Sequence, residues 1–175
     1  TPKPSSAASD VYKRQGVNMS KESFHTFNEY MKKEEDKLTA SMEDYLEMIY
    51  RLSSETKFTR IHDLANALNV QPPSATKMVQ KLSEYTLINY ERYGMITLTE
   101  KGKRLGNFLL DRHNTIEKFL KLLGISHNIL EQTEKIEHTI SNDTLIYLKN
   151  FVDFISSNPN LVKNFNIFCH TKNDK

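Results

Sequence analysis

The sequence predicts a mainly α-helical protein. Glycine and proline, which interrupt helices, each occur only five times in 175 residues. Beyond residue 38, apolar side chains recur at the three- and four-residue spacing of a helix face in one segment after another. The exceptions are two short β-prone runs, 87–91 and 95–98, separated by a turn. We therefore expect a helical chain that contains one small β-hairpin.

The composition is that of an ordinary soluble protein, with 26% charged and 38% hydrophobic residues and a net charge of +2. No apolar run reaches the ~18 residues of a membrane span, and no signal peptide opens the chain, so we expect a cytoplasmic protein with no membrane partner. Cys169 is the single cysteine, which excludes an intrachain disulfide and a multi-thiolate metal site.

The first 38 residues differ from the rest. Residues 1–18 are low in apolar content and resemble translated adapter sequence, so we expect a non-native, disordered leader and a natural start at Met19. Residues 19–38 hold aromatic side chains at helical spacing and then a run of charges, which predicts an amphipathic arm.

A firm helix is predicted over 39–53, with an apolar stripe formed by Met42, Tyr45, Leu46, Ile49 and Tyr50. Asp44 and Glu47 lie three residues apart on another face of this helix. Taken alone, such a pair is ordinary surface acid.

The next segment has the pattern of a helix-turn-helix. A short helix is predicted over 61–68, a turn over 69–71, and a second helix that starts at Pro72 and Pro73, where a missing N–H is tolerated. The β-hairpin that follows directly, with its turn at 92–94, is then a wing. An ordinary helical hairpin is the alternative interpretation of the two helices alone, and the wing argues against it.

Polar and basic side chains on the exposed side of this segment suit contact with DNA. Between residues 55 and 104 there are eight basic and five acidic side chains, in a nearly neutral chain. Thr76 and Gln80 can reach base edges, Lys77 and Lys81 can reach phosphates, and Arg92 lies at the tip of the wing. The predicted DNA-contacting residues are Arg60, Ser74, Thr76, Lys77, Gln80, Lys81 and Arg92.

The remainder is expected to be a helical domain. A long helix is predicted from an N-cap at Thr99 to about 123, before Gly124, with His113 at the edge of its apolar stripe. Further helices are predicted after caps at Ser126 and Ser141 and over 160–165. Leu145, Leu148, Phe151, Val152 and Ile155 should face inward. The domain limits we expect are 39–106 for DNA binding, 107–167 for metal binding and dimerisation, and 168–175 for a tail. So much apolar surface in so few residues predicts a homodimer.

One predicted helix in this domain carries metal-binding groups. Glu134, Glu137 and His138 fall on one helical face, beside a separate packing stripe formed by Ile129, Ile136 and Ile140. Two carboxylates and an imidazole are half of a site for a divalent cation. A solvated polar face is the alternative, and a lone histidine such as His113 is more often a hydrogen-bonded core residue than a ligand.

The order of these pieces resembles the diphtheria toxin repressor family of iron- and manganese-dependent repressors, and above all its short, manganese-responsive branch. The resemblance covers roughly 39–160 and is carried by the segments 41–50, 73–82, 98–102, 112–113 and 136–138. It implies that the metal ligands are Asp44, Glu47, His113, Glu134, Glu137 and His138. Four carboxylates and two imidazoles form a hard, oxygen-rich set suited to Mn²⁺, and a bridging carboxylate such as Glu137 would allow two ions per subunit.

The resemblance implies a repressor that binds a palindromic double-stranded DNA operator as a homodimer, with Mn²⁺ as its co-repressor. Two alternatives stay open: an Fe²⁺-responsive repressor of the same family, and a winged-helix regulator with a non-metal ligand. An enzyme is disfavoured because the paired Glu-x-x-His motifs of di-iron oxidases, nucleophile–base pairs and glycine-rich phosphate loops are missing from the sequence.

Overall fold

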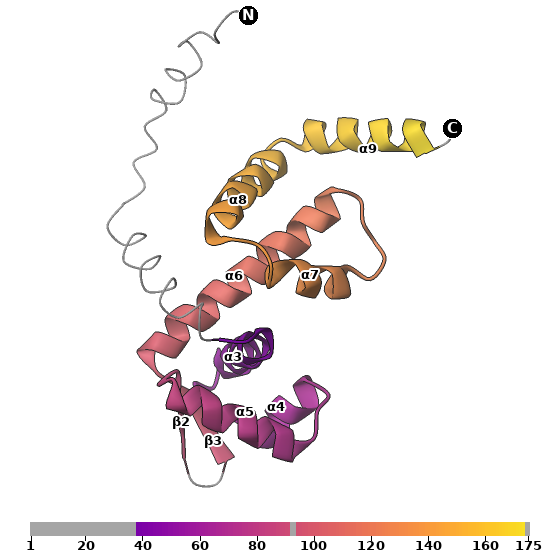
Figure 1. The fold of residues 1–175 in the computed structure, drawn as a ribbon. Helices are drawn as coiled ribbons and strands as arrows, with labels where there is room; N and C mark the ends of the chain where they lie inside the picture. The colour runs from indigo at the N-terminus through magenta and orange to yellow at the C-terminus, as the bar shows by residue number, and fades with distance from the viewer. Residues whose placement is uncertain (1–37, 92–93, 174–175) are drawn as a thin grey trace, which may run out of the picture. The chain divides into compact units, whose positions relative to one another are not determined.

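The computed structural model describes residues 38–91 and 94–173, all of which belong to one compact unit, Leu38–Lys175. The expected leader over 1–18, nearly all of the 19–38 arm, and Arg92 at the tip of the wing therefore lie outside the described residues. The elements are α3 (Ala40–Ser53), β1 (Thr59–Arg60), α4 (Ile61–Ala67), α5 (Pro72–Glu84), β2 (Ile88–Tyr90), β3 (Met95–Leu98), α6 (Glu100–Leu122), α7 (Ile129–Glu137), α8 (Asn142–Ser156) and α9 (Pro159–Asn173) (Figure 1).

The helix-turn-helix and wing are confirmed, with one strand more than predicted. The sheet is antiparallel in the order β1-β3-β2, with Ile88 opposite Leu98 and Thr59 opposite Ile96. The hairpin of β2 and β3 was predicted from its β-prone residues. Strand β1 was not, because two residues are too few to show a period and only the pairing with β3 defines them.

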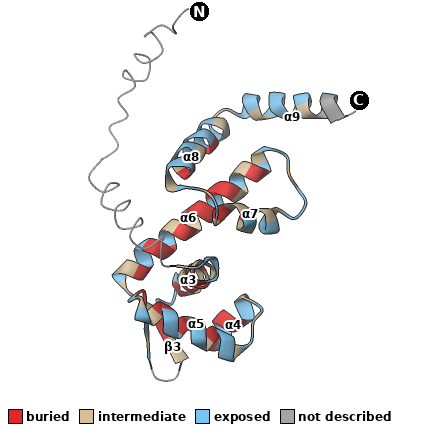
Figure 2. Ribbon diagram, viewed as in Figure 1, coloured by how far each residue is buried: buried red, intermediate tan, exposed pale blue. Residues whose placement is uncertain are grey.

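The core of the DNA-binding half lies where α3, α4, α5 and the sheet meet. Fully or almost fully buried side chains there are Leu46, Ile49, Leu64, Ala65, Ala75, Val79, Leu82, Leu87, Ile88 and Ile96. These are largely the residues that helical spacing placed inward, so the predicted stripes are confirmed. Figure 2 shows the buried positions on the sides of these elements that face one another.

Helix α6 links this half to the rest of the chain without a break. The Thr99 side chain accepts a hydrogen bond from the N–H of Gly102, and the helix ends before Gly124, which has φ +82°. Helix α6 packs against α3, α7 and α8, and the absence of a side chain at Gly106 leaves room for Tyr50 of α3. Residues 106 and 107, where we expected a domain limit, both lie inside this helix, so the two halves share a rigid element.

Gly102 is predicted to be intolerant of any side chain. An added Cβ would stand 1.9 Å from the carbonyl oxygen of Leu87, which already accepts hydrogen bonds from the N–H and the hydroxyl of Thr99. Gly102→Ala should therefore lower the free energy of unfolding by about 3 kcal/mol in urea denaturation. Lys103→Ala, at an exposed position in the same turn, is the control and should change it little. Equal stability of the two variants would contradict this packing.

Three details of the C-terminal helices differ from prediction. Helix α7 has its N-cap at Asn128, in a left-handed conformation and with no side-chain hydrogen bond, rather than at Ser126. Phe151 is 47% exposed, although helical spacing placed it inward. Helix α9 runs over 15 residues, far beyond the short helix expected at 160–165 and into the expected tail. Helices α8 and α9 have few packing partners within one chain: α8 packs against α6 and α9, and α9 packs against α8.

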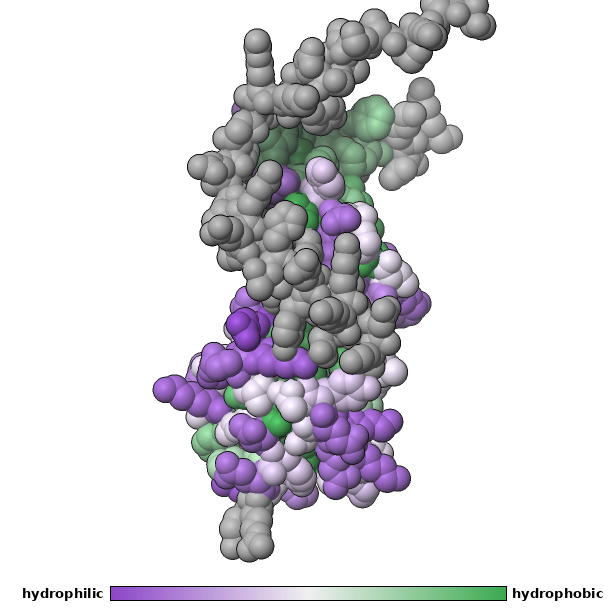
Figure 3. Space-filling model, turned by 60° about the vertical axis from the view of Figure 1, so that its left-hand side comes forward, coloured by the Kyte–Doolittle hydropathy of each residue, from purple (hydrophilic) through white to green (hydrophobic). Residues whose placement is uncertain are grey.

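Apolar side chains accordingly remain exposed on these two helices, namely Tyr147, Phe151, Phe154, Leu161, Phe165, Ile167 and Phe168. Hydrophobic surface gathers at the end of the molecule that carries α8 and α9, whereas the surface around α4, α5 and the wing is largely hydrophilic (Figure 3). A patch of this kind marks an interface with another protein chain. Within the described residues, no helix is both long and apolar enough to cross a bilayer.

Candidate metal centre and DNA interface

The structure brings all six predicted metal ligands together from three helices. Asp44 and Glu47 come from α3, His113 from the middle of α6, and the other three from α7 and the residue that caps its end. Their donor atoms form two groups, each with all atoms within 4.8 Å of one another: Asp44, Glu134, Glu137 and His138 in the first, and Glu47, His113 and Glu137 in the second. We call these the Asp44 cluster and the Glu47 cluster, and Glu137 belongs to both.

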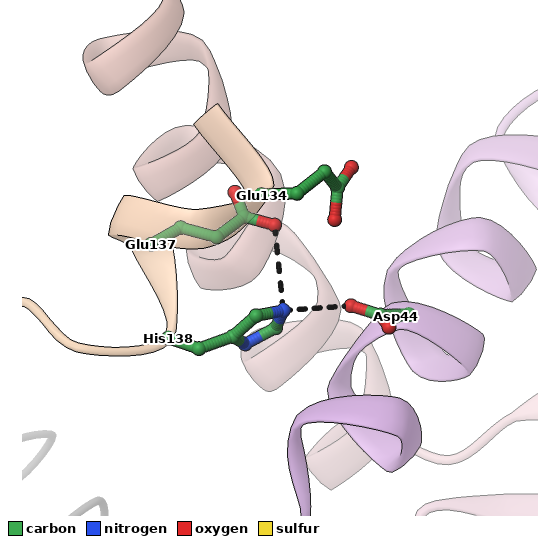
Figure 4. Close-up of side chains that lie close together, drawn as sticks. All are labelled: Asp44, Glu134, Glu137 and His138. Carbon is green, nitrogen blue, oxygen red and sulfur yellow. Dashed lines mark ion pairs between the residues drawn. The ribbon is translucent and has the colours of Figure 1, made fainter. Parts of the chain in front are cut away.

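The Asp44 cluster lies across the gap between α3 and α7 (Figure 4). Nε2 of His138 is 2.9 Å from Oδ1 of Asp44 and 3.8 Å from Oε1 of Glu137. The Glu134 side chain extends from α7 toward the same space. The side chains of Asp44 and Glu134 are 37% and 43% exposed, so this cluster is open to solvent on one side.

The Glu47 cluster is more deeply buried. Nδ1 of His113 is 3.0 Å from Oε2 of Glu137 and 3.9 Å from Oε1 of Glu47. The exposed fractions of Glu47, His113 and Glu137 are 7%, 5% and 1%. Carboxylates are almost never buried to this degree without a partner, so a solvated polar face is excluded for Glu47 and Glu137.

The most deeply buried side of helix α7 lies beside the predicted isoleucine stripe, not on it. Its buried residues are Thr133 and Glu137, while the isoleucines expected to form the packing stripe, Ile129, Ile136 and Ile140, are only half-buried. Helical spacing alone ranks apolar faces as inward. Here the ion pair with His113 of α6 compensates for burying Glu137, which no local pattern can reveal.

Burial and crowding change the protonation of these groups. Burial, followed by the charges of Glu137 and Asp44, raises the pKa of Glu134 to about 7. Burial also raises the pKa of Asp44. Burial opposes ionisation of Glu137 as well, but its hydrogen bond to His113 and the nearby positive charges outweigh that effect and lower its pKa. The same hydrogen bond, against the effect of burial, raises the pKa of His113. The site thus holds both anions and exchangeable protons.

Two residues that hold the site together were missed as functional residues. Oε2 of Glu43 accepts a hydrogen bond from Nη2 of Arg112 at 2.7 Å and lies 2.9 Å from Nδ1 of His138. All three side chains are less than a fifth exposed. Glu43 therefore joins α3, α6 and the end of α7. Its only signal in the sequence was its place beside Asp44, since the burial of Arg112, which requires a carboxylate partner, appears only in the fold.

A pocket of about 400 Å³ opens onto both clusters, since Asp44 and Glu134 line it together with the three residues of the Glu47 cluster. Its wall also includes Arg51, Met48, Leu68 and Leu130. Nε and Nη2 of Arg51 donate hydrogen bonds to Oε1 of Glu47 at 2.9 and 2.5 Å. The donor set as a whole consists of carboxylate oxygens and imidazole nitrogens, without sulfur. Such a set is able to hold a hard divalent cation, and the sharing of Glu137 would allow two.

The predicted DNA-contacting residues lie mainly on exposed surface. Ser74, Lys77, Gln80 and Lys81 are exposed along α5, and Arg60 is exposed on β1. Thr76 is half-buried, and its hydroxyl donates to the carbonyl oxygen of Pro72 at 3.0 Å, which leaves the hydroxyl oxygen able to accept a hydrogen bond from a base. Helix α5 follows the turn of the motif, which is the position of a recognition helix.

A helix-turn-helix with a wing, joined by one helix to a domain with clustered carboxylates and histidines, defines the class of metal-controlled DNA-binding regulators. Comparison with known proteins agrees. Residues 37–96 match the family model described as the iron dependent repressor N-terminal DNA binding domain, and residues 99–164 match its metal binding and dimerisation domain. The chain belongs to the iron-dependent repressor family of metal-dependent transcriptional repressors, which bind double-stranded DNA and form homodimers.

Curated relatives support this. The chain is 41% identical over 126 residues to the HTH-type transcriptional regulator MntR of Lysinibacillus sphaericus, covering 71% of this chain and 91% of the relative. It is 44% identical over 121 residues to MntR of Shouchella clausii, covering 69% and 85%. Among solved structures, the manganese regulator SloR matches with a TM-score of 0.57 and 32% identity over 65% of this chain, which spans about half (54%) of that protein.

Proposed function

We propose that this chain is a Mn²⁺-dependent repressor that controls metal-ion homeostasis and is not an enzyme. The observation that carries the proposal is the convergence of Asp44, Glu47, His113, Glu134, Glu137 and His138 into two clusters that share one buried carboxylate. The donor chemistry favours a hard cation, and the names of the relatives point to manganese. Each subunit would hold up to two ions, one per cluster.

The helices that carry the proposed ligands indicate how metal binding would act on the DNA-binding half of the protein. A bound divalent cation supplies positive charge that the four carboxylates can share. In its absence Asp44 on α3 and Glu134 and Glu137 on α7 repel one another across the gap between their helices. Helix α3 also packs against α4 and α5, so holding α3 in place also fixes the position of α5, the proposed recognition helix. To convert a mostly inactive population into a mostly active one, the preference for the DNA-competent arrangement must reach about 10⁴-fold, or ~5.5 kcal/mol.

For DNA recognition we infer that α5 enters the major groove. Thr76 and Gln80 would contact base edges, Ser74, Lys77, Lys81 and Arg60 would contact phosphates, and Arg92 would act at the wing. A symmetric dimer would place its two copies of α5 about 34 Å apart, or a multiple of that, on a palindromic operator. Residues 39–106 would bind DNA, and residues 107–167 would bind metal and form the dimer, which are the domain limits expected from the sequence. The protein would work in the cytoplasm, where its DNA target lies.

Fe²⁺ is the second candidate effector. Two imidazoles in a buried site suit Fe²⁺ as well as Mn²⁺, and the matching family models are described as iron dependent. The residues and the DNA-binding step would be the same, and only the metal that reaches the required occupancy in the cell would differ.

The test is a metal-resolved DNA-binding measurement. Duplexes selected from a random pool by the protein with Mn²⁺ would be titrated with protein in chelator, Mn²⁺, Fe²⁺ or Zn²⁺. We expect at least a hundredfold tighter binding with Mn²⁺ than with chelator, and the metal with the largest effect identifies the effector. DNA binding that is equal with and without every divalent metal would contradict the proposal and favour a regulator with a non-metal ligand.

The pKa shifts predict opposite effects of pH on the metal-free and metal-bound protein. The pKa of Glu134 rises from 4.5 to about 7 on folding and that of His113 is raised from 6.5, so the folded chain binds more protons than the unfolded one. Without metal, the stability from Glu134 is therefore lost as pH rises from about 4.5 through about 7, and that from His113 is lost as pH rises above 6.5. Metal binding must displace the same protons, so Mn²⁺ affinity rises over the same pH range. Urea denaturation should give a falling midpoint with chelator and a rising midpoint with limiting Mn²⁺. Parallel trends would contradict the assignment.

A further inference from the structure

A fixed positive charge stands at the Glu47 cluster. Arg51 lies in the last turn of α3, one turn after Glu47, and both of its hydrogen bonds end on Oε1 of that carboxylate. The same oxygen lies 3.9 Å from Nδ1 of His113, another donor of this cluster. Arg51 also lines the pocket that opens onto both clusters. A guanidinium therefore already binds the Glu47 oxygen that lies nearest to the imidazole of His113.

We propose that Arg51 is a built-in competitor for the cation at the Glu47 cluster, so that this cluster binds its ion more weakly than the Asp44 cluster and fills second. This inference rests on the proposed function, because it assumes that the two clusters hold divalent cations. It adds an order of filling and names the residue that sets it.

The competition has two physical parts. A guanidinium bound to Oε1 of Glu47 uses lone pairs that would otherwise coordinate the ion. A divalent cation placed at the cluster would also stand within a few ångströms of that charge. Since the side chain of Glu47 is only 10% exposed, solvent and salt screen the repulsion poorly.

The Asp44 cluster has a different kind of partner. Oδ1 of Asp44 lies 2.9 Å from Nε2 of His138, an imidazole that is itself one of the proposed ligands. Arginine cannot be deprotonated in proteins, so Arg51 can only be displaced. Before any ion binds, the Glu47 cluster therefore holds a permanent positive charge that must be displaced. The Asp44 cluster holds an imidazole instead, even though the two clusters share Glu137.

Because Arg51 can be displaced, it would compete with the cation for Glu47 and would not exclude the cation from the cluster. Its side chain is 36% exposed and lies in the last turn of α3, so it can turn into solvent once the cation concentration is high enough. The expected consequence is a graded response, with one ion bound at low metal concentration and a second only at higher concentration.

The experiment compares stepwise Mn²⁺ binding to the full chain and to Arg51→Met, which keeps an unbranched apolar stem and removes the charge. The control is Arg104→Met, an exposed arginine on α6 whose replacement changes the net charge equally. Calorimetry and equilibrium dialysis would give the number and affinity of bound ions, and electron paramagnetic resonance would report pairs of neighbouring Mn²⁺ ions. Arg51→Gln serves as a second neutral variant, and Arg51→Lys retains the charge.

We expect the parent protein to bind its second ion at least about tenfold more weakly than its first. Arg51→Met and Arg51→Gln should tighten the second step by about tenfold or more, leave the first step within about threefold, and show paired Mn²⁺ at lower metal concentration. Arg51→Lys and Arg104→Met should behave like the parent. If the parent binds only one ion, the neutral Arg51 variants should gain the second.

Different failures have different meanings. A parent protein that binds no divalent cation would overturn the proposed function itself. Binding by the parent with two equal affinities, or an unchanged second step in both neutral Arg51 variants, would overturn this inference and leave the proposed function standing. Equal tightening of both steps would also overturn it, because the charge would then act on the whole site rather than on the Glu47 cluster.

Discussion

Glu137→Ala is expected to abolish metal-stimulated DNA binding. Glu137 is the one residue that contributes a donor atom to both clusters, and its side chain is 1% exposed, so no other carboxylate can take its place. Loss of an outer partner of a ligand already costs about 10- to 100-fold in metal affinity, and loss of the shared ligand should cost more than ~100-fold. DNA binding should then stay at its chelator level over the whole Mn²⁺ titration.

A second variant separates this loss from misfolding. Glu137→Gln keeps the shape of the side chain and an oxygen that can accept a hydrogen bond from His113, but it removes the negative charge. It should fold as the parent does by circular dichroism and still lose most Mn²⁺ affinity. Glu131→Ala, on the exposed side of the same helix, is the control and should keep the response. A Glu137→Gln protein that still binds DNA only when Mn²⁺ is added would remove Glu137 from the site.

Glu43→Ala is expected to damage both stability and metal binding. It leaves the guanidinium of Arg112, which is 5% exposed, without its carboxylate, and breaking a buried pair in this way costs about 3–5 kcal/mol. An ionised carboxylate only accepts hydrogen bonds, so Glu43 also keeps a proton on Nδ1 of His138 and turns Nε2 toward Asp44. Its loss should reduce Mn²⁺ affinity by about 10- to 100-fold.

The double variant Glu43→Ala/Arg112→Met distinguishes the two effects. With both charges gone the unpaired guanidinium disappears, so urea denaturation in chelator should give a smaller loss of stability than Glu43→Ala alone. The Mn²⁺ affinity should stay low in both, because His138 lacks its acceptor in each. A single Glu43→Ala variant that loses less than about 1 kcal/mol would show that Arg112 finds another partner, and unchanged Mn²⁺ affinity would show that Glu43 does not position His138.

Predictions from the sequence succeeded where the cause is local. Thr99 and Ser141 each accept a backbone hydrogen bond as an N-cap, as polar residues before apolar periodic segments should. They failed where a local signal was weak or misleading. The cap of α7 has no side-chain hydrogen bond at all, and Glu137 of that helix is more deeply buried than its isoleucines.

The sequence by itself determined the helices, the helix-turn-helix with its wing, and six side chains able to bind a metal, because these depend on spacing, capping and side-chain chemistry within a few residues. Only the tertiary structure decided that Glu137 is shared by two clusters, that Glu43 holds Arg112 and His138, and that Arg51 occupies an oxygen of Glu47 beside His113. Most of these contacts join helices that lie far apart in the chain. Their energies come from burial and from charges brought within a few ångströms, and both exist only once α3, α6 and α7 have packed together.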